Sequence, residues 1–341
     1  MDGIPPLLAE LLLEPGPSGF EDAVHAVVRR EAAGFGADVG SDVLGSTIAR
    51  VHGTGAGRTL ALFAHADQVG MIVRDAAAPG LLTVTKLGGW RPASAVGQRV
   101  RVLTRDGELR GVVVAPDEGE PGWESLRVDI GAADREDALG LVRVGDPIVL
   151  DGPPELLHGG RVVSAALDDR AGIYAALEAL RRLAAAPAAW DVVLVVSTQE
   201  ETGTHGGARV AAQALAPDVA VVVEVTYDAD APGPEPWGDV RLGGGPTVFR
   251  GAVVNPVVGD GLLAVAEQER IEVAIESGQE TASDADDIFT AGSGVACGIV
   301  CIPLRYMHTA GEIVQLSDVD AASRLVEAYA RSLRDDDSFV R

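Results

Sequence analysis

Apolar runs of strand length alternate with segments of helical length on both sides of residues 69–157. The runs that predict strands cover residues 47–52, 59–66, 191–198, 218–226, 271–276 and 295–302. The segments that predict helices lie within 6–34 and at 169–185, 205–215 and 317–334. Strands that alternate with helices in this way predict an α/β domain with a mainly parallel mixed sheet flanked by helices.

Residues 69–157 follow a different pattern of short alternating segments, separated by tight-turn pairs such as Gly88-Gly89 and Asp106-Gly107. This pattern is typical of β-hairpins, so it predicts a small β-barrel-like domain inserted into the main domain. The chain then divides into a main domain formed by residues 1–68 and 158–341 and an inserted domain formed by residues 69–157.

Pro15-Gly16-Pro17-Ser18-Gly19 separates the two helices predicted near the N-terminus. Ser18 and Glu21 have the spacing of a capping box. We therefore expect Ser18 to cap the second helix and Glu21 to bond back to the backbone of Ser18.

Composition narrows the functional classes. The chain has 341 residues, 47% of them apolar and only 4% aromatic, which favours parallel strands under Ala-rich helices over an aromatic-cored sandwich. Its formal net charge of -24 makes nucleic acid an unsuitable partner, because phosphate binding depends on Lys and Arg. The same charge disfavours an anionic membrane.

Cys297 and Cys301 lie in one apolar run, where four residues of strand separate them by ~13 Å, beyond the ~7 Å limit of a disulfide. We expect buried thiols. Glu10 interrupts the apolar residues near the N-terminus, and no basic segment precedes them, which does not fit a signal peptide. No apolar stretch approaches the ~18 residues of a membrane span. The protein is therefore expected in the cytoplasm.

Side chains that can bind metals recur where the apolar runs end. They are His65, Asp67, Asp168, Asp169, Glu200, Glu201, Glu224 and His308. Because the carboxyl ends of parallel strands meet at one edge of a sheet, this distribution predicts a metal site there.

Spacing suggests roles for some of these residues. His65 and Asp67 face the same side of a strand, so Asp67 could orient the imidazole of His65. Glu200 and Glu201 can share one site only if the strand ends there and the backbone turns, as Gly203 allows. A metal ligand beside a general base suits a hydrolase that activates water.

Each residue also has a simpler interpretation. A His-X-Asp pair is often structural, as is a lone histidine after a strand such as His308. Asp168 or Asp169 could be a helix cap, although capping does not explain the Arg170 and Gly172 that follow. Glu224, within an apolar strand, would be costly to bury without a cation or hydrogen-bond donors.

The ligand types favour a borderline metal. Two imidazoles and three or four carboxylates, without a thiolate, suit zinc, cobalt or manganese. Five ligands are too many for one catalytic zinc that keeps a water molecule, but they suit two ions that share a carboxylate.

With these residues in place, the chain resembles the tetrahedral (TET-type) aminopeptidases, dinuclear metallo-exopeptidases that include glutamyl and leucyl aminopeptidases and some members labelled endoglucanases. The resemblance covers nearly the whole chain. It rests on the motifs Pro17-Ser18-Gly19-Phe20-Glu21, Ala64-His65-Ala66-Asp67, Leu87-Gly88-Gly89-Trp90, Val128-Asp129-Ile130-Gly131-Ala132, Leu167-Asp168-Asp169-Arg170, Gln199-Glu200-Glu201, Gly244-Gly245-Pro246 and Arg305-Tyr306-Met307-His308.

The resemblance implies a role for each matching residue. His65 and Glu224 would hold one metal ion, Glu201 and His308 would hold the other, and Asp168 would bridge them. Glu200 would be the general base, with Asp67 the partner of His65. The cofactors would be two divalent ions per chain, zinc or cobalt, and the inserted β domain would mediate dimers that can build a hollow dodecamer.

Three residues depart from the commoner family pattern. Gln68 stands where Glu is usual, Ser46 where Asn is usual, and Glu224 where Asp is usual. The longer Glu224 side chain keeps the ligand chemistry but can shift one metal ion. These departures put the metal preference and the rate in question.

The leading hypothesis is a cytoplasmic, dinuclear aminopeptidase that acts on short peptides and requires their free amino group. A related deacylase or carboxypeptidase is the main alternative, because Arg170 or Arg305 could bind a substrate carboxylate; we expect both to support the site through neighbouring acids instead. A glycosidase based on Glu200 and Glu201 would not need the two histidines. A metal-free assembly scaffold would not need the ligand set.

Overall fold

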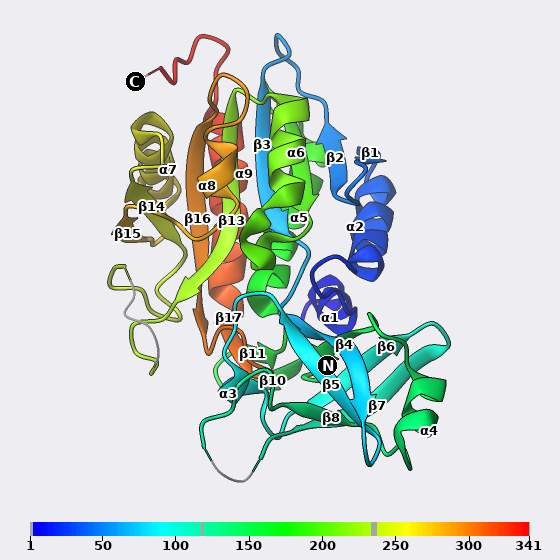
Figure 1. Cartoon of the computed structure of the whole chain (residues 1–341). Coiled ribbons are helices and arrows are strands. Elements are labelled where there is room, and N and C mark those ends of the chain that lie inside the picture. The colour runs from blue at the N-terminus through cyan, green and yellow to red at the C-terminus, as the bar shows by residue number, and fades with distance from the viewer. Residues whose placement is uncertain (1–2, 117–118, 233–236, 341) are drawn as a thin grey trace.

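A large α/β domain and a small β barrel make up the molecule (Figure 1). The computed structural model describes residues 3–116, 119–232 and 237–340. Its helices are α1 Pro6–Leu13, α2 Asp22–Gly34, α3 Pro92–Ala95, α4 Arg135–Leu141, α5 Leu167–Ala185, α6 Gly206–Leu215, α7 Pro256–Glu269, α8 Ala285–Ile288 and α9 Leu316–Ser332, with one further helical turn, η1, at Glu200–Thr204.

The large domain is built on an 11-stranded mixed sheet. Its central strands run parallel in the order β12 Asp191–Ser197, β3 Thr59–His65, β13 Val219–Tyr227 and β16 Ala296–Arg305. Antiparallel pairings extend the sheet on both sides through β1 Asp38–Ser41, β2 Thr47–Val51, β10 Glu155–Leu157, β11 Arg161–Ser164, β14 Thr247–Gly251 and β17 Glu312–Gln315. Strand β15 Ala274–Gly278 pairs in parallel with β14.

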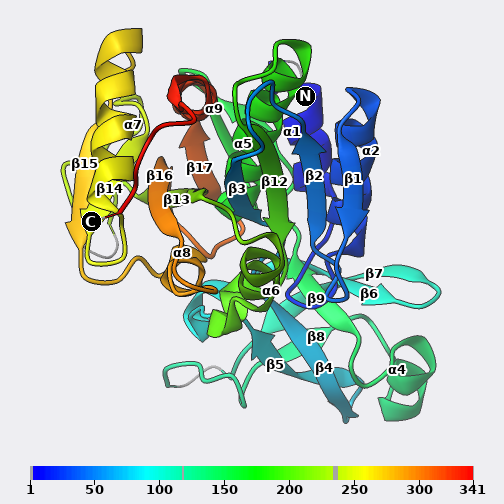
Figure 2. The same cartoon turned by 90° about the horizontal axis from the view of Figure 1, so that it is seen from above.

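Helices cover both faces of this sheet (Figure 2). One core lies between the sheet and a layer that contains α5, α7 and α9, and it includes Leu62 and Val221. A second core lies on the other face against α6 and α8, and it includes Phe63 and Val222. Because neighbouring residues of a strand point to opposite faces, each central strand contributes to both cores, which explains its continuous apolar sequence.

The barrel closes through the strand order β4 Gly70–Ala77, β5 Leu81–Leu87, β8 Arg127–Asp129, β7 Gly107–Val114, β6 Arg99–Thr104 and β9 Pro147–Leu150. It has an apolar core of its own, centred on residues such as Met71, Val100 and Ile148. The chain enters on β4 and leaves on β9, which pair with each other through Met71 and Ile148. Such an insertion leaves the large domain's sheet continuous.

The predicted fold class is confirmed: a mixed sheet flanked by helices carries a β-barrel insert. The barrel strands lie within the predicted insert 69–157, although β10 near its end pairs with β11 of the large sheet. The parallel part of the sheet is limited to its centre and to the β14–β15 pair.

Sequence patterns missed helix α7, although Asn255 caps it through Val257 N–H and Pro256 follows at the first helical position. They also missed the short strands β14 and β17. Periodicity is weak in these elements because α7 is rich in Val and Gly and the strands are short.

The capping-box prediction is wrong. Helix α2 begins at Asp22 without a side-chain cap. The Ser18 hydroxyl instead donates to Asp67 Oδ2 at 2.6 Å, and Glu21 Oε1 accepts from the N–H groups of Gly19 and Gln199. Both side chains are bound to groups near the predicted metal site, so tertiary contacts replaced the local cap.

The two cysteines are free and buried, as predicted. Within residues 3–116, 119–232 and 237–340, no helix is long and apolar enough to cross a membrane.

Candidate metal centre

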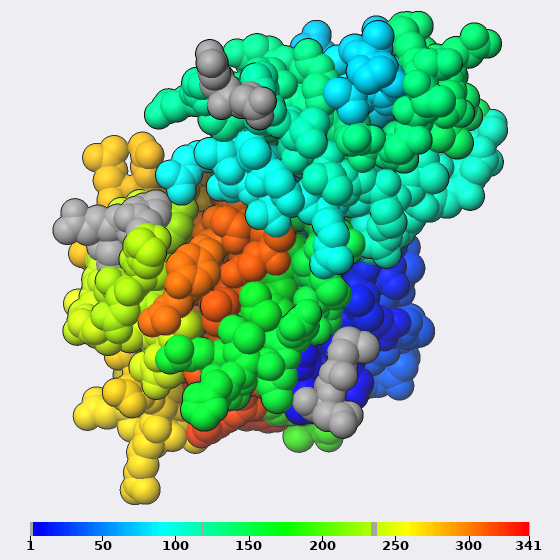
Figure 3. Space-filling view, turned by 90° about the horizontal axis from the view of Figure 1, so that it is seen from below, coloured from blue at the N-terminus to red at the C-terminus, as the bar shows by residue number. Residues whose placement is uncertain are grey.

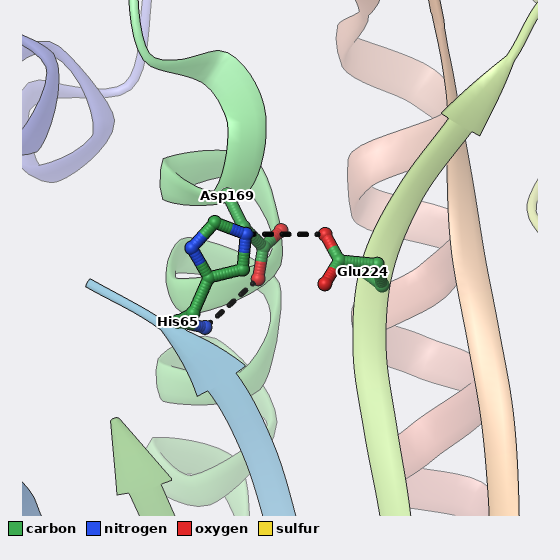
Figure 4. Close-up of side chains that lie close together, drawn as sticks. All are labelled: His65, Asp169 and Glu224. Carbon is green, nitrogen blue, oxygen red and sulfur yellow. Dashed lines mark hydrogen bonds and ion pairs between the residues drawn. The ribbon is translucent and has the colours of Figure 1, made fainter. Parts of the chain in front are cut away.

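The predicted ligands meet at the carboxyl ends of the parallel strands. His65 ends β3, Glu224 lies in the last part of β13, and Asp168 begins α5. Glu201 follows β12, and His308 follows β16. Figure 4 shows the Asp169 and Glu224 carboxylates on one side of the His65 ring, which they approach from α5 and β13. The structure therefore brings together all five residues predicted as ligands.

Asp168 lies between the two histidines. Its Oδ1 is 3.0 Å from His65 Nε2, and its Oδ2 is 3.2 Å from His308 Nε2. His65 Nε2 is also 3.5 Å from Glu224 Oε1, and His308 Nε2 is 3.2 Å from Glu201 Oε2. The cluster thus has two halves, each with one imidazole and one glutamate, joined by one aspartate.

The other nitrogen of each imidazole is held by the protein. His65 Nδ1 is 3.1 Å from the carbonyl oxygen of Asp67 and 3.4 Å from its Oδ1. His308 Nδ1 is 3.2 Å from the carbonyl oxygen of Gly89, between β5 and α3 of the barrel region. A hydrogen bond at one ring nitrogen directs the other toward a metal ion, which is the usual arrangement of histidine ligands.

Asp67 also fixes the turn that carries the two glutamates. Its Oδ1 accepts from the N–H of Glu200 at 2.9 Å, and its Oδ2 accepts from the N–H of Glu201 at 3.0 Å. The strand has already ended at Ser197, and Gln199 and Gly203 have positive φ angles of 64° and 71°. The predicted strand end and backbone turn are therefore present, and both glutamates reach one site.

Asp169 has the capping role that the sequence left open for either aspartate. Its Oδ1 accepts from Gly172 N–H at 3.0 Å, and its Oδ2 accepts from His65 N–H at 3.3 Å. A Cβ atom added at Gly172 would lie 2.6 Å from the carbonyl oxygen of Val223 and would collide with Asp169. Gly172 thus allows α5 to begin against β13 with Asp168 turned toward the histidines.

The buried Arg170 donates to backbone carbonyls of Leu11, Glu14 and Ala66. It therefore joins the end of α1 to the loop after His65. Burial lowers its pKa, and the charges of Asp67 and Glu21 oppose this effect, so neighbouring acids do act on the guanidinium. Arg305 agrees with the expectation, because its Nε donates to Asp228 Oδ2 at 2.7 Å.

The electrostatics of the cluster show an excess of buried negative charge. Burial raises the pKa of Glu201 to about 7 and that of Glu200 well above its usual value. Burial opposes protonation of His308, yet Asp168 and Glu201 raise its pKa to about 12. Burial also opposes protonation of His65, yet Glu224 and Asp168 raise its pKa well above the usual value. These carboxylates favour cations in the site.

The residues fit divalent ions. Ligand atoms of His65, Asp168 and Glu201 all lie within 4.8 Å of one another. The buried Glu201 Oε1 has no hydrogen-bond partner among the described residues. When ionised, the three proposed ligand carboxylates and Glu200 would carry four negative charges, which two divalent ions would balance. Imidazole and carboxylate ligands suit zinc or cobalt.

The sequence did not reveal Glu312 as part of the site. Its Oε1 accepts from His308 N–H at 2.7 Å, and its Oε2 accepts from Asp168 N–H at 3.1 Å. This buried side chain therefore fixes the backbones of two proposed ligands. A single glutamate in a short strand resembles an ordinary surface residue, so the local pattern had no signal for it.

A cavity of about 230 Å³ adjoins the cluster. Its lining includes Glu200, Glu201 and Glu224 as well as Trp237 and Phe249. None of the described lining residues is Lys or Arg. A larger cavity of about 880 Å³ lies between α1 and the barrel and contains none of the predicted site residues.

The exposed segment after β16, which carries His308, lies beside the barrel on the face shown in Figure 3, where it is orange and the barrel is cyan to green. A further cavity of about 730 Å³ is lined by His308 together with Arg91, Tyr306 and Met307. His308 thus lines both cavities, whereas the other four proposed ligands line only the cavity of about 230 Å³.

A helix-flanked mixed sheet with clustered histidines and carboxylates at its strand ends defines a hydrolase of the α/β exopeptidase class. Comparison with known proteins identifies the family: the profile of the M42 glutamyl aminopeptidases matches residues 45–325. The chain belongs to this family and is a peptide hydrolase with aminopeptidase relatives, as the sequence predicted.

Its relatives extend over nearly the full chain. A lysyl aminopeptidase of Pyrococcus furiosus is 33% identical, with 96% of this chain and 97% of the relative covered. The structure of an aminopeptidase from Desulfurococcus kamchatkensis superposes with a TM-score of 0.90 at 32% identity, covering 96% and 94%. The TET1 peptidase of Pyrococcus horikoshii can assemble into a tetrahedron or a large octahedral shell. Its structure superposes with a TM-score of 0.85 at 29% identity, with 96% of this chain and 99% of that chain covered.

Proposed function

We propose that the protein is an aminopeptidase with two divalent metal ions that removes the N-terminal residue of short peptides. The observation that carries this proposal is the acidic cavity beside the paired histidines, whose described lining has no Lys or Arg. A positively charged α-amino group is favoured in such a site, whereas a C-terminal carboxylate is repelled.

Each half of the cluster would hold one ion. His65 and Glu224 form the first set, Glu201 and His308 form the second, and Asp168 would bridge the two. When bound, such ions lower the pKa of water and polarise the peptide carbonyl. Zinc and cobalt are the ions that we propose for this donor set.

Glu200 would act as the general base. It lies on the cavity wall beside the proposed ligand Glu201. It would take a proton from the attacking water and pass it to the nitrogen of the leaving peptide. His205 Nε2 lies 3.6 Å from Glu200 Oε1, and His205 Nδ1 lies 2.7 Å from Asp287 Oδ2. These contacts would position the Glu200 carboxylate.

The site also offers negative charge for the substrate ammonium. The buried Asp284 accepts a hydrogen bond from Ser197, while its Oδ1 has no hydrogen-bond partner among the described residues. Glu200 and Asp284 lie close enough for the Asp284 charge to raise the pKa of Glu200, after the larger effect of burial. We propose that these acids favour a free amino group.

N-acetylation of a substrate should therefore abolish its cleavage. The experiment compares one tetrapeptide with its N-acetylated and C-terminally amidated forms, using zinc- or cobalt-loaded protein and chromatography of the products. Acetylation removes the ammonium charge, so no product is expected, whereas amidation should change the rate little. Preferred cleavage of the acetylated peptide would move the protein to the deacylase or carboxypeptidase class.

One observation favours that alternative class. The exposed Arg91 lines the cavity of about 730 Å³, which His308 also lines, and could bind a carboxylate. In an aminopeptidase this cavity would receive the part of the peptide that leaves. Because Arg170 and Arg305 are bound to backbone carbonyls and to Asp228, neither is an alternative carboxylate site.

Removal of the barrel should prevent assembly. We propose that residues 69–157 form an oligomerisation domain that mediates dimers and a dodecamer; the dodecamer and the tetrahedral or octahedral shells described for solved TET1 structures support a large oligomer. Because β4 and β9 are neighbours, a short linker can replace residues 70–150 while β10 stays in the large sheet. Sedimentation should then detect only small particles, and an intact dodecamer would contradict the proposal.

Particle size, rather than activity, must be the readout of that experiment. The excision also removes Gly89, whose carbonyl oxygen holds His308 Nδ1. Activity would therefore fall for a reason that is unrelated to assembly. We propose short peptides as the substrates and the cytoplasm as the compartment in which the enzyme acts.

A further inference from the structure

A buried carboxylate outside the proposed ligand set also lines the cavity beside the metal centre. Glu276, on β15, is 1% exposed and lines this cavity. The Thr226 hydroxyl donates to its Oε1 at 2.6 Å, and the Thr247 hydroxyl donates to its Oε2. Burial raises the pKa of Glu276, and hydrogen bonds from Thr226, Thr247 and the Cys301 thiol oppose this effect. These donors favour an ionised acceptor.

Strand register explains why Glu276 belongs to the same cavity as the ligands. Glu224 of β13 is aligned with Cys301 of β16, which is aligned with Thr247 of β14. Aligned residues of paired strands share a face. Phe249, two residues beyond Thr247, is aligned with Glu276. Glu224 and Glu276 therefore lie on the same face of the sheet.

Part of the cavity lining is apolar. Trp237 and Phe249 pack edge to face with ring centroids 5.6 Å apart, and Ile299 and Met307 also line the cavity. Thr226, which contacts Glu276, lies two residues from Glu224, a distance of about 7 Å along a strand. A lysine or arginine side chain has an apolar stem and spans a comparable length.

We propose that Glu276 makes this enzyme prefer substrates with an N-terminal Lys or Arg. The apolar walls would pack against the stem of the side chain, and Glu276 would bind its cationic end. The described cavity lining has no Lys or Arg that could already neutralise Glu276. An N-terminal Glu would meet like charge. This inference rests on the proposed function, because it takes the cavity as the pocket for the first residue of the peptide.

The family does not settle this preference. The family is named for glutamyl aminopeptidases, whereas the relative from Pyrococcus furiosus is a lysyl aminopeptidase. The preference must therefore come from the residues of each pocket. In this chain, the charge of Glu276 is the feature of the pocket that separates cationic from neutral side chains of similar length.

The first test measures kcat/KM of the metal-loaded protein on aminoacyl substrates with Lys, Arg, Met or Glu. We expect Lys and Arg to be preferred and Glu to be the poorest. Glu276→Gln should lower kcat/KM for Lys and Arg on the order of 10²-fold and change it little for Met, because only the cationic side chains lose a buried ion pair. Equal losses on all four substrates, or a preference for Met that Glu276→Gln leaves unchanged, would overturn the inference.

Asp318→Asn is the matched control. Asp318 is also a buried carboxylate, and it accepts from the N–H groups of Gly243 and Gly245 before β14. It does not line the cavity. This substitution should lower thermal stability without changing the ratio of Lys to Met cleavage. If it changed that ratio as Glu276→Gln does, the effect would be structural and the inference would be wrong.

A binding measurement separates this inference from the proposed function. Calorimetry with zinc-loaded protein compares L-lysine with its uncharged analogue L-norleucine, neither of which can be hydrolysed. L-lysine should bind more tightly to the original protein, and Glu276→Gln should remove the difference. If this result were found without cleavage of any aminoacyl substrate, the proposed function would fail, while Glu276 would still be shown to bind the cationic side chain. Equal binding of both amino acids would overturn the inference, whatever the activity.

Discussion

Glu200→Gln is expected to lose activity about 10²-fold or more in kcat while it retains its metal ions. The amide keeps the shape of the side chain but cannot accept a proton from water. Glu201 Oε2 lies 3.2 Å from Nε2 of the proposed ligand His308. The histidine beside Glu200 is instead His205, which is not a proposed ligand. Kinetics combined with elemental analysis of the purified variant provides the measurement.

Glu201→Gln is the matched comparison, because it makes the same chemical change at the adjacent residue. The Glu201 carboxylate faces His308 and has a buried oxygen without a partner among the described residues, as expected for a ligand in need of an ion. This variant should therefore lose metal affinity. A Glu200→Gln protein without metal and a Glu201→Gln protein with normal metal content would reverse our assignment of base and ligand.

The second large effect is expected from removal of the metal ions. Chelator should abolish activity, and zinc or cobalt should restore it, because the site concentrates carboxylates that need cations. His65→Ala and His308→Ala should each weaken metal binding by at least about 100-fold, since even the loss of a residue that only supports a ligand costs about 10–100-fold. Elemental analysis should find two ions per chain in the original protein and fewer in both variants.

His158→Ala is a suitable control for these substitutions. His158 is exposed between β10 and β11, away from the cluster. Its replacement should leave the metal content and the activity unchanged. Full activity of the original protein after complete removal of metal would overturn the dinuclear proposal for this chain.

The three departures from the family pattern have distinct structural settings. Gln68 bonds with Gly16, since Gly16 N–H donates to Gln68 Oε1 at 3.3 Å and Gln68 N–H donates to the Gly16 carbonyl at 2.9 Å. Ser46 is fully buried near Gly207, where a small side chain fits against α6. Glu224 Oε1 also accepts a hydrogen bond from Val225 N–H at 2.9 Å, so the Glu224 side chain folds back onto its own strand.

The sequence predicted the strands that build the centre of the site because their pattern is local. Continuous apolar runs are the mark of parallel strands buried on both faces, and metal-binding side chains stood where those runs ended. The carboxyl ends of parallel strands meet at one edge of a sheet, so the sequence predicted a single metal site there, and the family resemblance paired His65 with Glu224. The hairpin pattern of the barrel is local in the same sense.

Other parts of the site depend on contacts between distant segments. Glu312 binds the backbones of Asp168 and His308, and the Gly89 carbonyl from the barrel region orients His308. Such bonds use backbone groups that every residue has, so no residue pattern distinguishes them. The same reason explains why Ser18, at ideal capping-box spacing, instead donates to Asp67.

The sequence by itself determined the fold class and the chemical type of the site, because hydrophobic periodicity and ligand chemistry are properties of short segments. Only the tertiary structure decided how the ligands are oriented and that Glu276 lines the cavity beside them. Glu276 lies on an edge strand that reaches Thr226 only after β14 and β15 have paired beside β16. Its place in the site is a product of strand order and register, which local sequence does not specify.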